Sequence, residues 1–124
     1  MYSKRDWGDA EEYVRIAFKI ISYHRPDDYV ICSGISYSIK DFVNIACKYL
    51  RIPIKWTGSG LNEKAVSLKN KTIIMVKKNL FRNHDINYLK SDCSKAKKDL
   101  GWRPKKINKL IKKMIDYELN FSDY

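Results

Sequence analysis

The chain has 124 residues, of which 44% are hydrophobic and 31% are charged, so it suits one compact domain and is too short for two. No apolar run approaches the ~20 residues of a membrane span, and no segment resembles a signal peptide, so we expect a cytoplasmic protein without a membrane partner. The formal net charge of +11 excludes few classes of partner, because a basic surface attracts nucleic acid, acidic membranes and phosphorylated small molecules alike.

The first predicted helix begins at Asp9, which forms a D-x-x-E capping pair with Glu12. Apolar residues then recur at helical spacing as far as Ile21, and Arg25-Pro26 ends the pattern. The β-rich run 29–32 follows two turn-forming aspartates and predicts a short buried strand.

The second predicted helix begins with a capping box formed by Ser38 and Asp41, and its apolar stripe extends to Leu50. Residues 54–57 and 72–76 are rich in β-branched and apolar side chains, which predicts two brief strands. We expect a loop at 58–60 and irregular structure over 61–71.

Asp92 is placed to cap a short helix over 94–100, and Gly101 to end it in the left-handed conformation. The last predicted helix covers 107–119, with an inner face formed by Ile107, Leu110, Ile111, Met114, Ile115 and Leu119. The strands are few and short, so we expect them to need a larger sheet or a partner surface to complete their ladders.

The cysteines and histidines indicate neither a disulfide framework nor a metal site. Cys32, Cys47 and Cys93 are odd in number and form no C-x-x-C pair, so we interpret them as reduced structural thiols. His24 and His84 lie far apart in the sequence without acidic or cysteine partners at ligand spacing. We therefore expect no metal ligand in this chain.

Four stretches together resemble a known family. They are RDWGDAEEYV (5–14), DDYVICSGISYSIKDFV (27–43), IKWTGSGLNE (54–63) and SDCSKAKKDLGWRPK (91–105). They come in the order seen in GDP-mannose 4,6-dehydratases, which belong to the extended short-chain dehydrogenase/reductase superfamily. The resemblance implies an α/β fold in which residues 1–124 form a single domain, the helix-rich C-terminal substrate-binding portion of an extended Rossmann-type enzyme. It also implies few short strands and no dinucleotide-binding βαβ unit.

The motifs that carry the family's chemistry are missing from this sequence. Gly58-Ser59-Gly60 is only a partial match to a dinucleotide fingerprint, because Glu63 stands at the third glycine position. No tyrosine has a lysine four residues later, so the superfamily's Tyr-x-x-x-Lys pair is absent. We therefore expect no catalytic or cofactor-binding residue here and no activity of the chain alone, although the intact family uses NADP.

The resemblance implies that Arg5, Arg82 and Asp85 contact the substrate. In the superfamily, the arginine of the R-D-W motif and a second arginine in an R-x-x-[DE] motif contact the diphosphate and its nucleoside. Arginine suits this role because its planar fork makes paired hydrogen bonds to phosphate oxygens. The alternatives are a structural pair of Arg5 with Asp6 or Asp9, and a plain surface position for Arg82. Lys40 is expected to face the surface, and Asp6 and Trp7 to fasten their segment to the core.

The sequence is thus interpreted as a truncated member of a family that converts GDP-mannose to GDP-4-keto-6-deoxymannose, a precursor of fucose. We expect weak binding of GDP-mannose or GDP, a separate dinucleotide-binding chain as partner, and self-association. One alternative is a small basic module that binds nucleic acid or protein, although no recognised nucleic-acid motif supports it. Another is an inactive relic.

Overall fold

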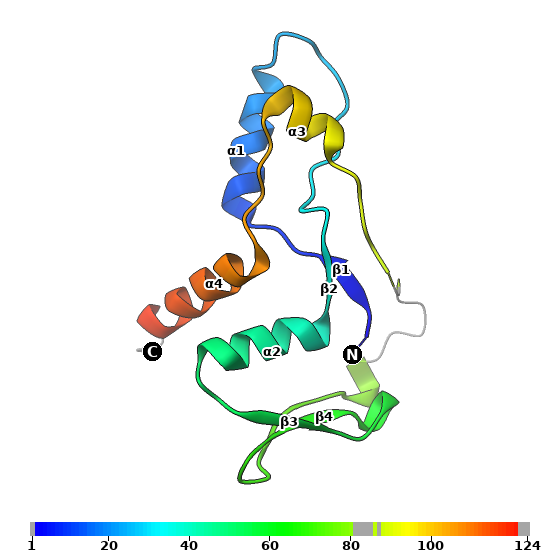
Figure 1. Cartoon of the computed structure of the whole chain (residues 1–124), viewed down its shortest axis with the longest axis vertical. Coiled ribbons are helices and arrows are strands. Elements are labelled where there is room, and N and C mark those ends of the chain that lie inside the picture. Colours follow the sequence, from blue (N-terminus) through cyan, green and yellow to red (C-terminus); the bar gives the residue numbers. More distant parts are fainter. Residues whose placement is uncertain (1, 81–85, 87, 122–124) are drawn as a thin grey trace.

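The structure is a computed structural model that describes residues 2–80, 86 and 88–121. Its elements in chain order are β1 (Lys4–Asp6), α1 (Ala10–Ile21), β2 (Ser36–Ser38), α2 (Ile39–Tyr49), β3 (Ile54–Thr57), η1 (Gly60–Asn62), β4 (Lys64–Ser67), β5 (Thr72–Met75), η2 (Lys78–Leu80), α3 (Ser94–Leu100) and α4 (Ile107–Phe121). Helices α1 and α3 lie at one end, α2 and α4 lie in the middle, and the sheet of β3, β4 and β5 lies at the other end (Figure 1). The predicted α/β class with few short strands is confirmed.

The main core lies between α1 and α3. Ile16, Cys32, Ala96, Leu100 and Trp102 are buried there, and the indole Nε1 of Trp102 donates to the carbonyl of Cys32 at 2.7 Å. Gly101 has φ +63° and ends α3, as predicted, because glycine adopts this backbone conformation without a steric penalty.

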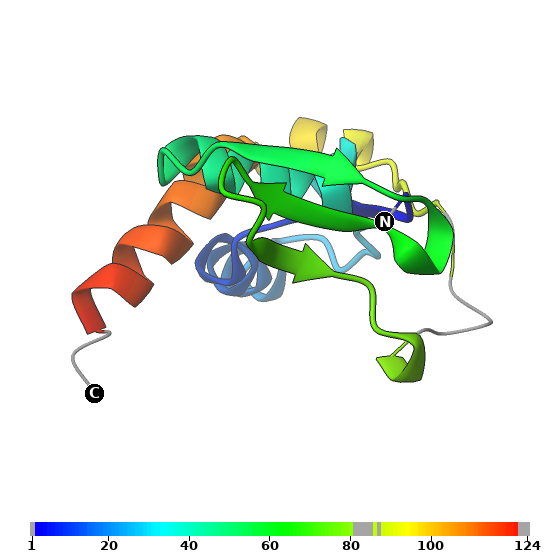
Figure 2. The same cartoon turned by 90° about the horizontal axis from the view of Figure 1, so that it is seen from below.

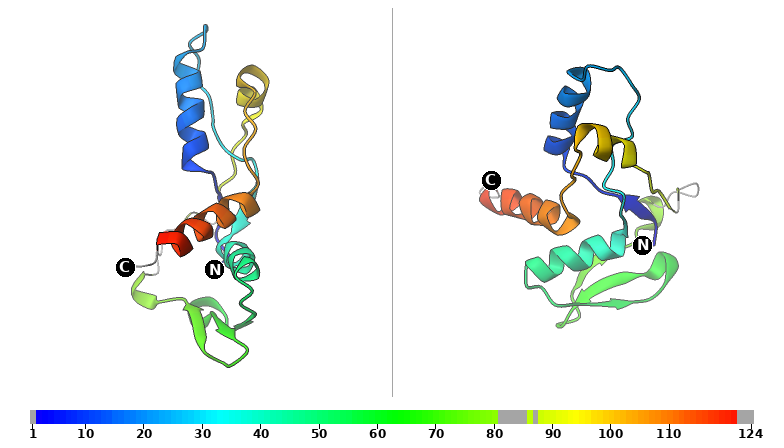
Figure 3. Two further views of the ribbon diagram at one scale, coloured as in Figure 1. Left: turned by 90° about the vertical axis from the view of Figure 1, so that its left-hand side faces the viewer. Right: turned by 45° about the horizontal axis from the view of Figure 1, so that its top comes forward.

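A second packed region joins α2 to α4. The predicted capping box is present: Ser38 Oγ accepts from Asp41 N at 3.0 Å, and the Asp41 carboxylate accepts from Ser38 N at 2.9 Å. Ile107, Leu110 and Ile111 of α4 are buried, but Met114 and Leu119 are 49% and 64% exposed. The predicted inner face of the last helix is therefore right only for its first half. Figure 3 shows α4 crossing α2 from two further sides.

The sheet at the far end has the antiparallel order β3-β4-β5. Strands β3 and β5 fall where they were expected, but β4 forms inside 61–71, for which irregular structure was predicted. The four residues of β4 carry a weak strand signal by themselves, and its ladders to both neighbours stabilise it. Figure 2 shows the three strands side by side, with α2 behind β3.

The buried strand predicted at 29–32 does not form. Tyr29, Ile31 and Cys32 pack on the main core. In the described part of the chain, however, no strand lies beside them to share a ladder. A strand requires such a neighbour, so the segment has a strand-like sequence and buried or partly buried side chains but no strand hydrogen bonding.

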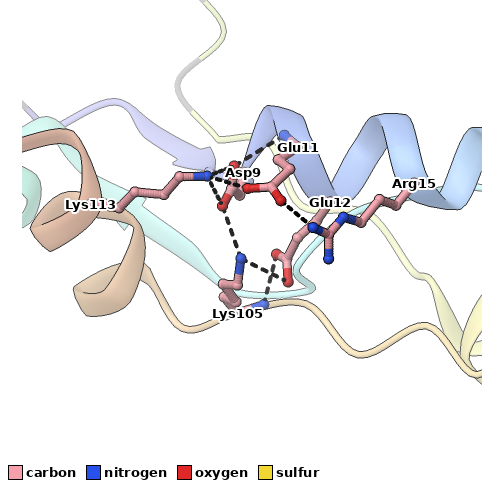
Figure 4. A network of polar contacts seen from close by, with 6 residues as sticks. All are labelled: Asp9, Glu11, Glu12, Arg15, Lys105 and Lys113. Carbon is pink, nitrogen blue, oxygen red and sulfur yellow. Dashed lines mark hydrogen bonds and ion pairs between the residues drawn. The ribbon is translucent and has the colours of Figure 1, made fainter. Parts of the chain in front are cut away.

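Asp9 joins the start of α1 to α4. Its side chain accepts from Glu11 N at 3.1 Å, which caps α1, and also from the Nζ atoms of Lys105 at 3.2 Å and Lys113 at 3.0 Å (Figure 4). Glu12 does not complete the predicted capping pair: its carboxylate accepts from Lys105 N at 3.1 Å instead. The start of α1 is thus fastened to residues about 100 positions later in the sequence.

No helix in the described part of the chain is both long and apolar enough to cross a membrane.

The hydrogen bonds from Lys105 and Lys113 to Asp9 predict how the stability of the fold depends on pH. Burial acts to raise the pKa of Asp9, but hydrogen bonds from Lys113 and Lys105 outweigh it, so the pKa lies below its usual value. A carboxylate with a lowered folded-state pKa stabilises the fold above its unfolded pKa of about 4, and this contribution is lost as pH falls through the folded pKa. We expect Asp9→Asn, which retains a good helix cap, to reduce the unfolding free energy by about 1–2 kcal/mol at pH 7.

Urea unfolding at pH 7 and near pH 2.5 checks this expectation. The difference between the wild-type chain and Asp9→Asn should shrink at the lower pH. Asp27→Asn is the control, because the pair of Asp27 with Lys95 is about half exposed and should contribute little. An equal effect of the two substitutions at pH 7 would contradict the central role of Asp9.

A second prediction concerns the glycines between β3 and β4. Gly58 and Gly60 have φ +72° and +56°, so alanine at either position costs about 1–2 kcal/mol in backbone strain. A Cβ on Gly58 would also lie 2.2 Å from the carbonyl oxygen of Asn62, whereas a Cβ on Gly60 meets nothing within 4 Å. Gly58→Ala should therefore lower the urea midpoint clearly more than Gly60→Ala does. Equal midpoints for the two variants would show that the contact between residue 58 and the Asn62 carbonyl does not constrain the loop.

Candidate functional site

The short ladder between β1 and β2 positions Arg5. The two strands are antiparallel, with Arg5 opposite Tyr37 and Asp6 opposite Ser36. Neither strand was predicted, because three residues are too few to show a period. The ladder joins Lys4, Arg5 and Asp6 to a segment that lies about 30 positions later in the sequence (Figure 1).

Arg5 contacts the segment that follows residue 85. Its Nη1 donates to the carbonyl of Lys4 at 2.9 Å and to the carbonyl of Ile86. The same region is joined by a bridge between Lys4 and Tyr88, and Leu89 N donates to the carbonyl of Lys4 at 3.1 Å. These contacts attach Ile86, Tyr88 and Leu89 to β1, more than 80 positions away in the chain.

Two of the predicted site residues, Arg82 and Asp85, lie outside the described residues. Asp85 immediately precedes Ile86 in the sequence. The three substrate-binding residues therefore remain a prediction, and the described geometry concerns Arg5 alone.

Asp6 holds the turn that precedes β2. Its carboxylate accepts from Ser33 N at 2.8 Å and from Gly34 N at 2.7 Å. Trp7 packs on Phe42 of α2 with the ring centroids 4.7 Å apart. These contacts confirm that Asp6 and Trp7 fasten the segment to its surroundings, and they keep Arg5 at a fixed place on the β1 strand.

Lys40 is not the surface-facing lysine that was expected. Its Nζ lies 3.0 Å from Glu63 Oε1 and 4.7 Å from the ring centroid of Trp56, and Glu63 is only 2% exposed. The hydrogen bond with Glu63 raises the pKa of Lys40. The pair joins α2 to the turn before β4. Glu63 is the only acidic residue among residues 48–80, and this was the one feature of the sequence that could have indicated a specific ion pair.

The cysteines have structural surroundings. Cys32, Cys47 and Cys93 are free and buried, and the Sγ of Cys32 lies 3.2 Å from the carbonyl of Ser91, to which it donates. Burial, together with the neighbouring Cys93 thiol, raises the pKa of Cys32 to about 11. A thiol with such a pKa stays protonated at neutral pH and makes a poor nucleophile. Among the described residues, no group of three or more His, Cys, Asp or Glu side chains could hold a metal ion.

Two open pockets lie away from Arg5. One, of about 260 Å³, is an apolar groove between α2 and α4, and the other, of about 230 Å³, lies beside Trp102 between α1 and the segment after α3. Arg5 lines neither of them. The described part of the chain therefore offers an anchored arginine at β1 but does not enclose it in either pocket.

Comparison with known proteins identifies the relatives of this chain. The family model for GDP-mannose 4,6 dehydratase matches residues 1–114. GDP-mannose 4,6 dehydratase of Drosophila melanogaster is 40% identical over 106 residues, which are 83% of this chain and 26% of the relative. GDP-mannose 4,6-dehydratase of Sinorhizobium fredii is 32% identical over 121 residues, which are 96% of this chain and 34% of the relative.

A solved structure shows the same fold. The Bordetella bronchiseptica enzyme WbmG, in complex with NAD and UDP, superposes with a TM-score of 0.67 at 17% identity. The match covers 97% of this chain and 34% of that one. Identity this low supports a shared fold and nothing finer.

This chain spans about a quarter to a third of the length of the curated relatives that it matches. The family model nevertheless covers nearly all of its residues, including all four motifs noted in the sequence. The chain therefore belongs to the GDP-mannose 4,6-dehydratase family.

Proposed function

We propose that this chain provides the nucleotide-sugar-binding part of a GDP-mannose 4,6-dehydratase, with Arg5, Arg82 and Asp85 as ligand contacts. The intact family would convert GDP-mannose to GDP-4-keto-6-deoxymannose, on the route to GDP-fucose. By itself the chain binds GDP-mannose or GDP weakly and is inactive. We also propose a cytoplasmic location, which the three free cysteines favour.

The observation that supports this proposal is the contact between Arg5 and Ile86. It joins the R-D-W motif to the residue directly after Asp85, across 81 positions of sequence. The first motif selected for ligand contact is thus attached to the residue that follows the second motif in the sequence. A guanidinium has five N–H donors in a rigid fork, so one arginine can hold a backbone carbonyl and also contact a diphosphate.

The segment Gly58-Ser59-Gly60 does not have the surroundings of a dinucleotide-binding turn. Gly58-Ser59-Gly60 lies in the connection between two antiparallel strands, β3 and β4, and leads into the three-residue turn η1. A dinucleotide fingerprint requires a glycine turn between a strand and a long helix, whose N-terminus holds the pyrophosphate. The oxidation and reduction steps therefore require residues beyond those described here.

We propose a dinucleotide-binding portion, carried by a separate chain, as the partner. Two features of the fold favour an additional surface. Residues 29–31 have no ladder neighbour in the described part of the chain, and α1 exposes an apolar stripe on the side away from α3. Val14, Phe18 and Ile21 of this stripe are 57%, 69% and 82% exposed, and they follow one another at i, i+4 and i+7.

Binding of GDP provides the direct test of the ligand site. We expect GDP to bind with a dissociation constant of about 0.1–1 mM, since a millimolar constant corresponds to only about 4 kcal/mol. Arg5→Lys keeps the positive charge but removes the fork, and should weaken binding several-fold in a calorimetric titration.

Arg103→Lys is the matched control, because Arg103 is an exposed arginine with no described partner. Equal affinities of the Arg5→Lys and Arg103→Lys chains for GDP would refute the proposed ligand site. A loss of GDP affinity on Lys109→Gln, equal to the loss on Arg5→Lys, would instead indicate unspecific attraction by the basic surface.

The exposed stripe of α1 predicts self-association when no partner is present. We expect the sedimentation coefficient to rise with protein concentration, and Phe18→Ser to reduce that rise by removing the largest side chain of the stripe. Leu68→Ser is the control, because Leu68 is 75% exposed but lies in the turn between β4 and β5. A monomer at every concentration, or equal effects of the two substitutions, would exclude the stripe as a contact surface.

A further inference from the structure

Positive charge is concentrated at the sheet end of the molecule. Residues 48–80 contain eight lysines and arginines and one acidic residue, so this stretch has a formal net charge of +7. The other residues contain 17 basic and 13 acidic side chains, which leaves a net charge of +4. More than half of the net charge thus belongs to about a quarter of the chain.

The structure places this charge on an open surface. The single acidic residue of the stretch, Glu63, is 2% exposed and paired with Lys40. The lysines around the sheet are all exposed, and within the described residues none of them has an ion pair or a side-chain hydrogen bond. We call this surface the basic sheet face. Its lysines are Lys55 and Lys64 on the strands, Lys69 and Lys71 in the turn between β4 and β5, and Lys77 and Lys78 directly after β5.

The strand register shows which side chains share this face. Trp56 points toward α2, where its Nε1 donates to Asn44 at 2.8 Å, so its neighbour Lys55 points the opposite way. Thr57 stands opposite Lys64, and Lys64 stands opposite Met75, so these residues share the face away from α2. Figure 2 looks at the sheet from the side opposite α2.

Aliphatic side chains are exposed among the lysines. Ile73 and Met75 of β5 are 40% and 52% exposed. Leu68, next to Lys69 in the turn after β4, is 75% exposed, and Leu80, after Lys77 and Lys78, is 73% exposed. The face therefore combines unpaired ammonium groups with apolar side chains that contact little of the protein.

From this combination we propose that the basic sheet face adsorbs to the surface of an anionic lipid bilayer. The lysines would contact lipid phosphates and carboxylates, and Leu68 and its aliphatic neighbours would enter the boundary of the acyl chains. Such adsorption needs no spanning helix, and it differs from the sequence-based expectation of no membrane partner.

A nucleic acid would satisfy the lysines but not the aliphatic side chains. Proteins that bind single strands present aromatic rings on which bases stack. The one aromatic side chain on β3–β5, Trp56, is turned toward α2 and lies under Lys40. A lipid surface provides partners for both kinds of exposed side chain, and we therefore favour it.

Cosedimentation with vesicles tests the proposal. The 124-residue chain should bind vesicles of equal parts phosphatidylserine and phosphatidylcholine, and should not bind vesicles of phosphatidylcholine alone. Binding should weaken strongly between about 0.1 M and about 1 M salt, because the screening length falls from ~10 Å to ~3 Å. The combined change Lys64→Gln, Lys69→Gln and Lys71→Gln should weaken binding at least about tenfold.

The matched control replaces three exposed lysines of α3, α4 and the segment between them, Lys98, Lys106 and Lys109, with glutamine. It removes the same charge and should weaken binding much less. Leu68→Ser should reduce vesicle binding several-fold, since an exposed turn residue can be changed without disturbing the core. Circular dichroism establishes that each variant is folded.

Three results would overturn the proposal. They are equal losses for the two lysine triples, no effect of Leu68→Ser, or binding of a short RNA that is tighter than vesicle binding and depends on the same lysines. GDP titration of the same variants is independent, because none of them changes Arg5, so this proposal and the proposed ligand site can fail separately.

Discussion

The strand β1 hydrogen-bonds along both of its edges, and the arrangement of the middle of the molecule depends on it. On one edge it pairs with β2, and on the other Lys4 bridges to Tyr88 and accepts from Leu89 N. Asp6 adds two bonds to the backbone of the turn at 33–34. Three residues thereby connect segments near positions 5, 35 and 88, and the surroundings of Arg5 follow from this connection.

The helices were predictable because their signals are local. The capping box of Ser38 and Asp41, and the left-handed Gly101 after α3, both appear as expected. Each such signal satisfies backbone groups within four residues, so distant parts of the chain cannot easily override it.

The strands differ in this respect, because a strand exists only beside a neighbour. Residues 29–32 have a strand-like sequence but no neighbouring strand among the described residues, and 64–67 have a weak strand sequence with neighbours on both sides.

For the candidate site, the sequence identified residue types and the structure gave their surroundings. Arg5 was selected through a family resemblance, but its contact with Ile86 joins positions 81 residues apart, which no local pattern encodes. The pairing of Lys40 with Glu63 was missed for the same reason. A lysine two positions into a helix has the sequence of a surface residue, and only the turn before β4 brings a buried carboxylate to it. Arg82 and Asp85 remain predictions.

The two ends of the molecule differ in how far apart their contacting residues are in sequence. The sheet and the helix that covers it are built from residues 39–75, with strands that follow one another directly. The main core brings together Ile16, Cys32 and Leu100, and the start of α1 is tied to Lys113. Closing a short loop costs less chain entropy than closing a long one, and folding rates follow this cost. The sheet end is therefore expected to form early, as a local unit, and the α1–α3 core to assemble onto it only once nearly the whole chain is present.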